Sequence, residues 1–194
     1  MITLILGPMF AGKSSFLLNE INKLKLIKKE YIAIKPKIDN RYSEDKIVSH
    51  NFISENCFSI NSLTELEETG LLDKIDIIII EEAQFFEGLR DFILKYELNK
   101  DFIIAGLSGD SDRKPFGEIL QVIPLCDNLI KLDSLCLECN DGNKAIFSRC
   151  NVNKNSQNLI GSNDLYSCVC RHHYHFPKHK NKSKKKINLL EHSL

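Results

Sequence analysis

A glycine-rich segment near the start of the chain carries a lysine and a serine at the spacing of a phosphate-binding loop. Residues 7–14 match the pattern G-x-x-x-x-G-K-[ST]. In such a loop, backbone N–H groups surround phosphate oxygens, the lysine reaches the β- and γ-phosphates, and the hydroxyl binds Mg²⁺. The segment therefore predicts binding of a nucleoside triphosphate and says little about a second substrate. Its residues are Gly7, Pro8, Met9, Phe10, Ala11, Gly12, Lys13 and Ser14.

Two acidic residues follow the most apolar run of the chain. Residues 77–80 are four isoleucines, which predict a central strand buried on both faces, and Glu81 and Glu82 come directly after them. Because ligands of doubly wound sheets bind at the carboxyl ends of the strands, we expect both carboxylates beside the phosphate loop. One could position Mg²⁺ while the other accepts a proton from the attacking group. A hydrolytic ATPase needs the same pair to activate water, so this feature alone does not distinguish a kinase from an ATPase.

A short polar segment follows the second predicted strand and contains Asp39 and Arg41. Placed near the phosphates, Asp39 could orient a metal-bound water molecule and Arg41 could neutralise phosphate charge.

Two pairs of cysteine and histidine residues have the spacing of metal ligands. Cys136 and Cys139 form C-x-x-C, and Cys170 and His173 form C-x-x-H. Two such pairs fit tetrahedral Zn²⁺ with Cys₃His ligation, and a closed set of four protein ligands would be structural. Three further side chains are available as alternative ligands: Cys168, His172 and His175. The other three cysteines lack a partner nearby in sequence and are interpreted as packing residues: Cys57, Cys126 and Cys150.

Strand-like and helix-like segments alternate over the first two-thirds of the chain, which predicts an α/β fold with a parallel sheet and covering helices. The predicted strands are residues 2–6, 31–34 (stopped by Pro36), 77–80, 102–105 and 129–132. One helix is predicted from Lys13, with an apolar face of Leu17, Ile21, Leu24 and Ile27. A capping box at Ser62 and Glu65 predicts a second helix ended by Gly70, and Leu89, Phe92, Ile93 and Tyr96 predict a third.

The composition changes after Ser134, where cysteine, asparagine and histidine become frequent and long apolar segments disappear. We therefore expect a nucleotide-binding α/β domain over residues 1–133, a zinc-binding domain over 134–177 and a basic, disordered tail over 178–194. Six lysines lie between Lys178 and Lys186, and without them the net charge of 0 becomes −6. Such a tail could bind nucleic acid, but a short charge block is more commonly a solvated terminus. Nucleic acid is therefore not the expected partner.

The 194 residues suffice for one ordinary domain with a small appendage, and 43% are hydrophobic, enough for a sizeable core. No apolar run approaches the roughly 18 residues that a membrane span needs. The first residues lack the basic start of a signal peptide. We expect a cytoplasmic protein without a membrane partner.

Taken together, these motifs resemble the type II thymidine kinase family, which includes cellular, bacterial and poxviral enzymes. The resemblance covers roughly residues 2–177, and the segments E-x-Q-F-F and R-K-P-F-G are its most specific parts. It rests on residues 7–14, 39–43, 81–86, 106–109 and 113–117, the pair Cys136 and Cys139, and Ile160-Gly161 with Asp164, Tyr166, Cys170 and His173.

The resemblance implies a P-loop (RecA-like) parallel-sheet domain and a small zinc-binding domain whose lasso loop folds over the nucleoside. Glu82 matches the catalytic base, and Ser148 matches a hydroxyl residue facing the nucleobase. The ATP site is completed by Asp39, Arg41, Glu81 and Gln84. The nucleobase pocket corresponds to Met9, Phe85, Leu107 and Phe116. The lasso corresponds to Leu159, Ile160, Gly161, Ser162, Asn163, Asp164 and Tyr166.

Three positions depart from the family pattern. Glu81 stands where the family usually has Asp, which changes the metal geometry by one methylene. Ser108 replaces the Asp of a common L-D-G segment, and Ser111 replaces a common aromatic residue. The loss of that aromatic weakens one wall of the base pocket and leaves room for altered affinity or relaxed base preference.

The expected reaction is transfer of the ATP γ-phosphoryl group to the 5′-hydroxyl of thymidine, a step of pyrimidine deoxynucleoside salvage and DNA precursor synthesis. We expect Mg²⁺ with ATP and a structural Zn²⁺. The resemblance also implies a homotetramer and feedback inhibition by thymidine triphosphate. The alternatives are a P-loop ATPase with a nucleic-acid-binding zinc element, a non-catalytic zinc module, and a related deoxynucleoside kinase with relaxed base preference.

Overall fold

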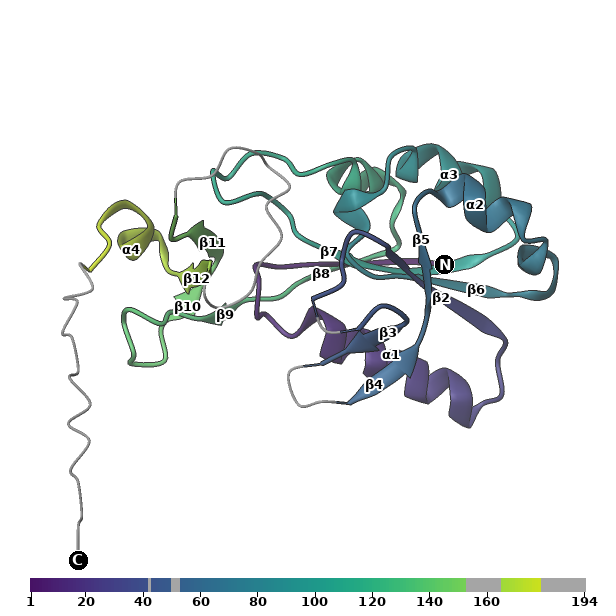
Figure 1. Ribbon diagram of the computed structural model, residues 1–194, viewed down its shortest axis with the longest axis horizontal. Coiled ribbons are helices and arrows are strands. Elements are labelled where there is room, and N and C mark those ends of the chain that lie inside the picture. The colour runs from purple at the N-terminus through teal and green to yellow at the C-terminus, as the bar shows by residue number, and fades with distance from the viewer. Residues whose placement is uncertain (42, 50–52, 153–164, 179–194) are drawn as a thin grey trace, which may run out of the picture.

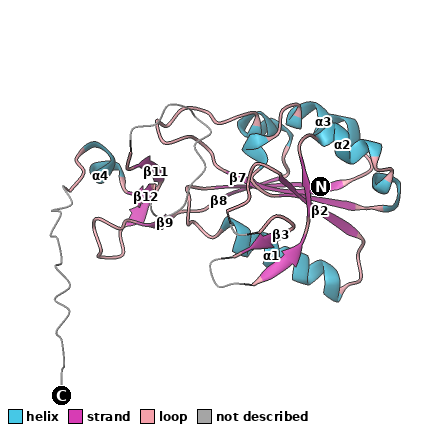
Figure 2. Ribbon diagram, in the orientation of Figure 1, coloured by secondary structure: helices cyan, strands magenta, loops and turns pink. Residues whose placement is uncertain are grey.

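The computed structural model describes residues 1–41, 43–49, 53–152 and 165–178. Its centre is a six-stranded parallel sheet with strand order β5-β2-β6-β7-β1-β8 (Figures 1 and 2). The strands are β1 (Ile2–Leu6), β2 (Tyr31–Pro36), β5 (Phe58–Ile60), β6 (Ile77–Ile80), β7 (Asp101–Gly106) and β8 (Asn128–Lys131). The expected α/β fold with a central parallel sheet is therefore confirmed.

Helices cover both faces of this sheet (Figure 1). On one face lies α1 (Lys13–Leu26), and on the other lie α2 (Leu63–Glu68) and α3 (Leu89–Tyr96). Three short 3-10 helices complete the connections: η1 (Leu71–Lys74), η2 (Ala83–Phe85) and η3 (Ile119–Leu125).

The isoleucine run of β6 divides its side chains between two hydrophobic cores. Ile78 and Ile80 pack with α2 and α3, whereas Ile77 and Ile79 pack with α1. Because successive side chains of a strand point to opposite faces, a strand between two helical layers must be apolar throughout. This confirms the prediction from the sequence and places Glu81 and Glu82 directly after the buried strand.

Most predicted elements form close to their expected bounds, with local differences. The Ser62 hydroxyl accepts a hydrogen bond from the Glu65 N–H at 3.2 Å, but the Glu65 carboxylate accepts from the Asn61 N–H instead of that of Ser62. Strand β2 runs through Pro36, because the pairing of Pro36 with Ile60 of β5 uses the Lys37 N–H, which donates to the Ile60 carbonyl at 2.9 Å, and needs no N–H from Pro36. Helix α1 ends before Ile27, whose side chain is exposed.

An unpredicted hairpin, β3 (Lys46–Val48) with β4 (Ser54–Asn56), lies between β2 and β5 in the chain. Its strands have only three residues each, and all three residues of β4 are polar, so neither strand carries a clear alternation.

Two further antiparallel pairs and a short helix lie beside the end of the main sheet that carries the phosphate loop (Figure 1). They are β9 (Ser134–Leu135) with β10 (Lys144–Ala145), β11 (Phe147–Cys150) with β12 (Tyr166–Val169), and α4 (Arg171–His175). We call residues 134–150 and 166–175 the cysteine module. Its buried cluster includes Met9 of the phosphate loop, which joins the module to the main sheet.

Among the described residues, no helix combines the length and the apolar character needed to cross a membrane. The expected lasso residues 159–164, most of the asparagine-rich segment and residues 179–194 lie outside the described part of the chain.

Candidate active site

The loop between β1 and α1 surrounds the start of the helix, as the phosphate-loop motif requires. Gly12 has φ +82° and Phe10 has φ +59°, so the loop contains two left-handed residues. The buried Lys13 ammonium donates a hydrogen bond to the Pro8 carbonyl at 2.9 Å and thus lies over the loop. Burial lowers the pKa of Lys13, and the Glu82 carboxylate opposes that shift. An anionic ligand in the loop would favour the charged lysine.

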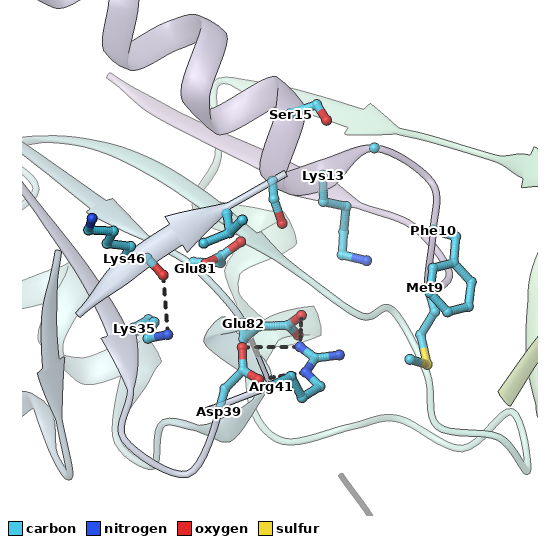
Figure 3. A pocket seen from close by; sticks show the side chains of 13 residues that line it. Met9, Phe10, Lys13, Ser15, Lys35, Asp39, Arg41, Lys46, Glu81 and Glu82 are labelled. Carbon is cyan, nitrogen blue, oxygen red and sulfur yellow. Dashed lines mark hydrogen bonds and ion pairs between the residues drawn. The ribbon is translucent and has the colours of Figure 1, made fainter. Parts of the chain in front are cut away.

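The pocket at this loop is lined by side chains from four parts of the chain (Figure 3). They come from the phosphate loop, the carboxyl ends of β2 and β6, and β3. The lining residues are Met9, Phe10, Gly12, Lys13, Ser14, Ser15, Lys35, Asp39, Arg41, Lys46, Val48, Glu81 and Glu82. The structure therefore brings most of the predicted ATP-site residues together.

Glu81 is buried and lines the pocket together with Ser14, whose hydroxyl acts to lower the pKa of the carboxyl group. Burial, and next the charge of Glu82, raise the pKa of Glu81 to about 7. A carboxylate and a hydroxyl side by side supply the oxygen ligands that Mg²⁺ prefers. The residues present therefore fit a magnesium ion bound with the nucleotide.

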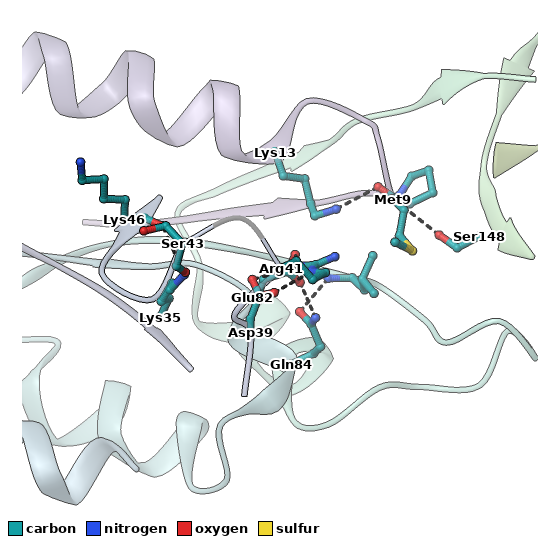
Figure 4. A network of polar contacts seen from close by, with 12 residues as sticks. Met9, Lys13, Lys35, Asp39, Arg41, Ser43, Lys46, Glu82, Gln84 and Ser148 are labelled. Atoms are coloured by element: carbon teal, nitrogen blue, oxygen red, sulfur yellow. Dashed lines mark hydrogen bonds and ion pairs between the residues drawn. The ribbon is translucent and has the colours of Figure 1, made fainter. Parts of the chain in front are cut away.

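Glu82 follows Glu81 but points its carboxylate at different partners. Its Oε1 accepts a hydrogen bond from Arg41 Nη2 at 2.7 Å, and its Oε2 accepts one from Gln84 Nε2 at 2.6 Å (Figure 4). Burial acts to raise the pKa of Glu82, but Arg41 and Lys13 outweigh it and hold that pKa below its usual value. Glu82 also has φ +50°, a conformation that non-glycine residues rarely adopt and that clusters at functional sites.

Asp39 holds two nitrogens of the Arg41 guanidinium group, one of which also donates to Glu82. Asp39 Oδ1 and Oδ2 accept hydrogen bonds from Arg41 Nε and Nη2 at 2.5 and 3.1 Å. The guanidinium group thus links the segment after β2 to the residue after β6. The sequence suggested that Asp39 orients a water molecule, whereas here its direct partner is Arg41.

Gln84 has a different environment from the one expected of an ATP-site residue. It is buried and is not among the residues that line the phosphate-loop pocket. Its amide donates to Glu82, and its Oε1 accepts a hydrogen bond from the Leu107 N–H at 2.9 Å. Gln84 therefore connects the expected base to the start of the segment after β7.

The sequence did not indicate Lys35, a buried cation at the end of β2. Its ammonium donates to the carbonyls of Ser43 and Lys46 and so fastens the segment that carries Asp39 and Arg41 (Figure 4). A lone lysine at the end of the apolar run 31–36 was the available signal. Ser15, Lys46 and Val48, which also line the pocket, had no such signal.

The residues expected to bind the nucleobase fall into two groups. The Phe85 and Phe116 rings meet edge to face, with centroids 5.1 Å apart. Met9, Leu107 and Tyr166 belong to the cluster of the cysteine module.

Ser148 lies at the junction between the phosphate loop and the cysteine module. Its Oγ accepts a hydrogen bond from the Met9 N–H at 2.8 Å, and the Cys168 thiol donates to the Met9 carbonyl at 2.6 Å. Both bonds fix the backbone of Met9, so the module shapes the side of the loop next to the expected nucleoside site.

The four predicted zinc ligands converge within the cysteine module. Their ligand atoms lie within 4.8 Å of one another. His173 Nδ1 is 3.5, 3.3 and 3.5 Å from the sulfurs of Cys136, Cys139 and Cys170, and the Cys139 and Cys170 sulfurs are 3.7 Å apart. Zn–S bonds of about 2.3 Å and Zn–N bonds of about 2.0 Å at tetrahedral angles require spacings of about 3.5 to 3.8 Å. The set therefore fits Zn²⁺.

The alternative zinc ligands lie elsewhere. The Cys168 thiol donates a hydrogen bond to the Met9 carbonyl, and the side chains of His172 and His175 are exposed. All seven cysteines are free thiols, so none forms a disulfide. The three cysteines interpreted as packing residues, Cys57, Cys126 and Cys150, are partly buried against the hydrophobic clusters.

Comparison with known proteins agrees with this geometry. The family model described as thymidine kinase matches residues 1–174. The chain is 38% identical over 179 residues to the thymidine kinase of Oryza sativa subsp. japonica, covering 89% of this chain and 65% of the rice protein, less than two thirds of its length. It is 39% identical over 179 residues to thymidine kinase a of Arabidopsis thaliana, covering 89% and 74% of the two chains. It is 37% identical over 177 residues to the thymidine kinase of Choristoneura fumiferana entomopoxvirus, covering 88% and 94%. The chain therefore belongs to the thymidine kinase family.

Proposed function

We propose that this chain transfers the γ-phosphoryl group of ATP to the 5′-hydroxyl of thymidine, giving thymidine monophosphate. The observation that carries the proposal is the position of Glu82 in a chain of this family. Its carboxylate lines the phosphate-loop pocket and is held there by Arg41 and Gln84. Because Arg41 and Lys13 lower its pKa, Glu82 is ionised at neutral pH and ready to accept the hydroxyl proton.

The other residues of the pocket position the triphosphate. Lys13 and the N–H groups of the phosphate loop bind phosphate oxygens, and Arg41 adds positive charge beside Glu82. A bound Mg²⁺ would neutralise charge on the transferring phosphoryl group, and Ser14 and Glu81 are the residues that would hold it. Catalysis then consists mainly of positioning and electrostatic stabilisation.

The nucleoside is proposed to bind between the main sheet and the cysteine module. The Phe85 and Phe116 pair and the cluster of Met9, Leu107 and Tyr166 support an apolar base pocket, with Ser148 at its edge. Residues 159–164, proposed to close over the base, would exclude water that otherwise competes as acceptor.

The zinc ion is proposed to be structural, because four protein ligands leave no open position for substrate. We assign residues 1–133 to the nucleotide-binding domain, 134–177 to the zinc and lasso domain, and 178–194 to a basic tail. The separate hydrophobic cluster of the cysteine module supports this division, although Met9 joins it from the first domain.

A cytoplasmic homotetramer inhibited by thymidine triphosphate is proposed for the assembled enzyme. The edge strand β8 supports self-association, because within the described residues it pairs with β1 alone, and it carries the exposed Leu129. Leu135 and Leu137 are further exposed apolar side chains. Nucleic acid and membranes are not proposed as partners.

A P-loop ATPase would need the same phosphate loop and acidic pair but not a base pocket, so this alternative is not favoured. The test is an assay of ATP with Mg²⁺ against a panel of deoxynucleosides. One methyl group in an apolar pocket discriminates by ~10- to 200-fold, so thymidine should exceed deoxyuridine in kcat/KM by that factor. Purine nucleosides should react far less well. Phosphorylation of deoxyadenosine as efficient as that of thymidine would contradict the proposed base pocket. Equal kcat/KM values for thymidine and deoxyuridine would favour the related deoxynucleoside kinase with relaxed base preference.

A further inference from the structure

The segment after β7, residues 107–116, carries the base-pocket residues Leu107 and Phe116 and is fixed at both ends to Gln84. The Leu107 N–H donates to Gln84 Oε1 at 2.9 Å. At the other end, Gly117 has φ +56°, and a Cβ added there would lie 2.0 Å from the Gln84 carbonyl oxygen. Both ends of the segment therefore lie against Gln84 of η2.

The tip of this segment is a turn held together by its own hydrogen bonds. Asp110 Oδ1 accepts from the N–H groups of Asp112 and Lys114 at 2.8 and 2.9 Å. The Arg113 N–H donates to the Asp110 carbonyl at 3.0 Å, and Arg113 has φ +64°. Because these hydrogen bonds close residues 110–114 into one turn, a contact that displaces one residue of the turn displaces the whole turn.

The cysteine module contacts this tip through the Tyr174 hydroxyl, through aromatic rings beneath the Arg113 guanidinium group and through His175. The Tyr174 hydroxyl donates to the Ser111 carbonyl at 2.8 Å. The Arg113 guanidinium carbon lies 4.4 Å from the Tyr174 ring centroid and 5.5 Å from that of Phe147. Arg113 Nη1 also lies 3.2 Å from His175 Nε2. We call Ser111, Arg113, Phe147 and Tyr174 the clasp.

Tyr174 follows the zinc ligand His173 directly and belongs to the five-residue helix α4. A helix of this length is not stable by itself, so its position depends on its tertiary contacts. Cys170 and His173, at its start and in its middle, are two of the four converging ligands. A bound zinc ion would therefore fix the helix that presents Tyr174 to the tip.

We propose that Tyr174 and Arg113 are positioning residues for the nucleoside site, and that the clasp transmits the order of the zinc site to residues 107–116. This inference rests on the proposed function for the identity of the nucleoside. The clasp would let the zinc site affect the base pocket independently of residues 159–164. Ser111 takes part through its backbone carbonyl, so the clasp does not need the aromatic side chain that this position has lost.

The test compares Tyr174→Phe with Tyr96→Phe. Each substitution removes one tyrosine hydroxyl. Tyr96 lies on α3, outside the site, and its hydroxyl donates a hydrogen bond to Glu67 of α2 at 3.0 Å. Loss of one hydrogen bond should raise the thymidine KM of Tyr174→Phe about two- to tenfold, with the ATP KM, kcat and zinc content unchanged. Arg113→Met, which keeps the chain length and removes the cation, should act in the same direction. Tyr96→Phe should leave both KM values unchanged.

Amide hydrogen exchange without any nucleoside separates this inference from the proposed function. Residues 107–116 should exchange faster in Tyr174→Phe than in the wild type or Tyr96→Phe. Removal of zinc from the wild type by a chelator should accelerate exchange in the same segment. If the wild type failed to phosphorylate thymidine, the proposed function would fall, yet the exchange measurement would still decide the clasp. Unchanged exchange in Tyr174→Phe, or an equal rise of the thymidine and ATP KM values, would overturn the clasp.

Discussion

Arg41 Nη2 donates a hydrogen bond to the carboxylate of Glu82 at 2.7 Å, and this pair joins the segment after β2 to the end of β6. Asp39 accepts hydrogen bonds from the same Nη2 and from Nε of Arg41. The base proposed for phosphoryl transfer is thus oriented by a side chain that the sequence linked only to phosphate charge.

Glu82→Gln should lower kcat by about 10²- to 10⁴-fold, the usual contribution of a positioned general base. Glutamine keeps the shape of the side chain and a hydrogen-bond acceptor but cannot take up the proton. ATP binding should persist, because Lys13 and the phosphate loop are untouched. Steady-state kinetics and an ATP-binding titration measure the two effects. Near-normal turnover in a folded variant would remove Glu82 from the role of base.

Glu81→Gln tests the second carboxyl group through the pH dependence of stability. Burial, and next Glu82, raise the pKa of Glu81 to about 7 in the folded protein, against about 4.3 in an unfolded chain. Between these values the folded state keeps a proton that the unfolded state has released, so the free energy of unfolding falls as pH rises. Glutamine resembles the protonated acid and avoids this loss. The variant should exceed the wild type in stability at pH 8 by at most about 4 kcal/mol, with no difference near pH 4.

Urea unfolding of both proteins across this pH range, without Mg²⁺ or nucleotide, makes the measurement. Glu68→Gln, which removes an exposed carboxylate on α2, is the matched control. A stability difference between Glu81→Gln and the wild type that stays constant from pH 4 to pH 8 would contradict the buried, protonated state of Glu81. In the kinetic assay the same variant should require more Mg²⁺, because it loses a charged metal ligand.

The four converging side chains of the cysteine module should bind one zinc ion. One Zn²⁺ per chain should be found in the purified protein and should be lost in Cys136→Ser plus Cys139→Ser. The matched control is Cys126→Ser plus Cys150→Ser, which removes two thiols outside the ligand set. Loss of zinc should raise the thymidine KM more than the ATP KM, because the cysteine module contacts Met9 and residues 107–116. Metal analysis showing equal zinc in both double variants would refute the ligand assignment.

The sequence predicted the parts of the fold that depend on local pattern. The four isoleucines of β6 and the glycine-rich loop are each defined by consecutive residues, so the sequence predicted both the buried strand and the phosphate loop. The C-x-x-C and C-x-x-H pairs likewise predicted the four converging ligands. The hairpin of β3 and β4 was missed, because strands of three residues show no periodicity.

Side-chain partners brought together from distant segments could not be predicted in this way. Gln84 lies between Glu82 and Leu107 only because β6 and β7 are neighbours in the sheet. Lys35 donates to the Ser43 carbonyl, and Tyr174 donates to the Ser111 carbonyl. Every residue has a backbone carbonyl, so the residue types do not indicate which of them accept these bonds. Family resemblance identified the segment of Leu107 but not what holds it.

The central claim is that phosphoryl transfer goes to thymidine and not to water, and product balance tests it most directly. Purified protein with Mg²⁺, ATP and excess thymidine should form ADP and thymidine 5′-monophosphate in a one-to-one ratio, and ADP formation should nearly cease when thymidine is left out. 5′-Deoxythymidine, which lacks the acceptor hydroxyl, should bind and compete without yielding a phosphorylated product. Formation of ADP at the same rate with and without thymidine, with no thymidine monophosphate, would contradict the account and identify the protein as an ATPase.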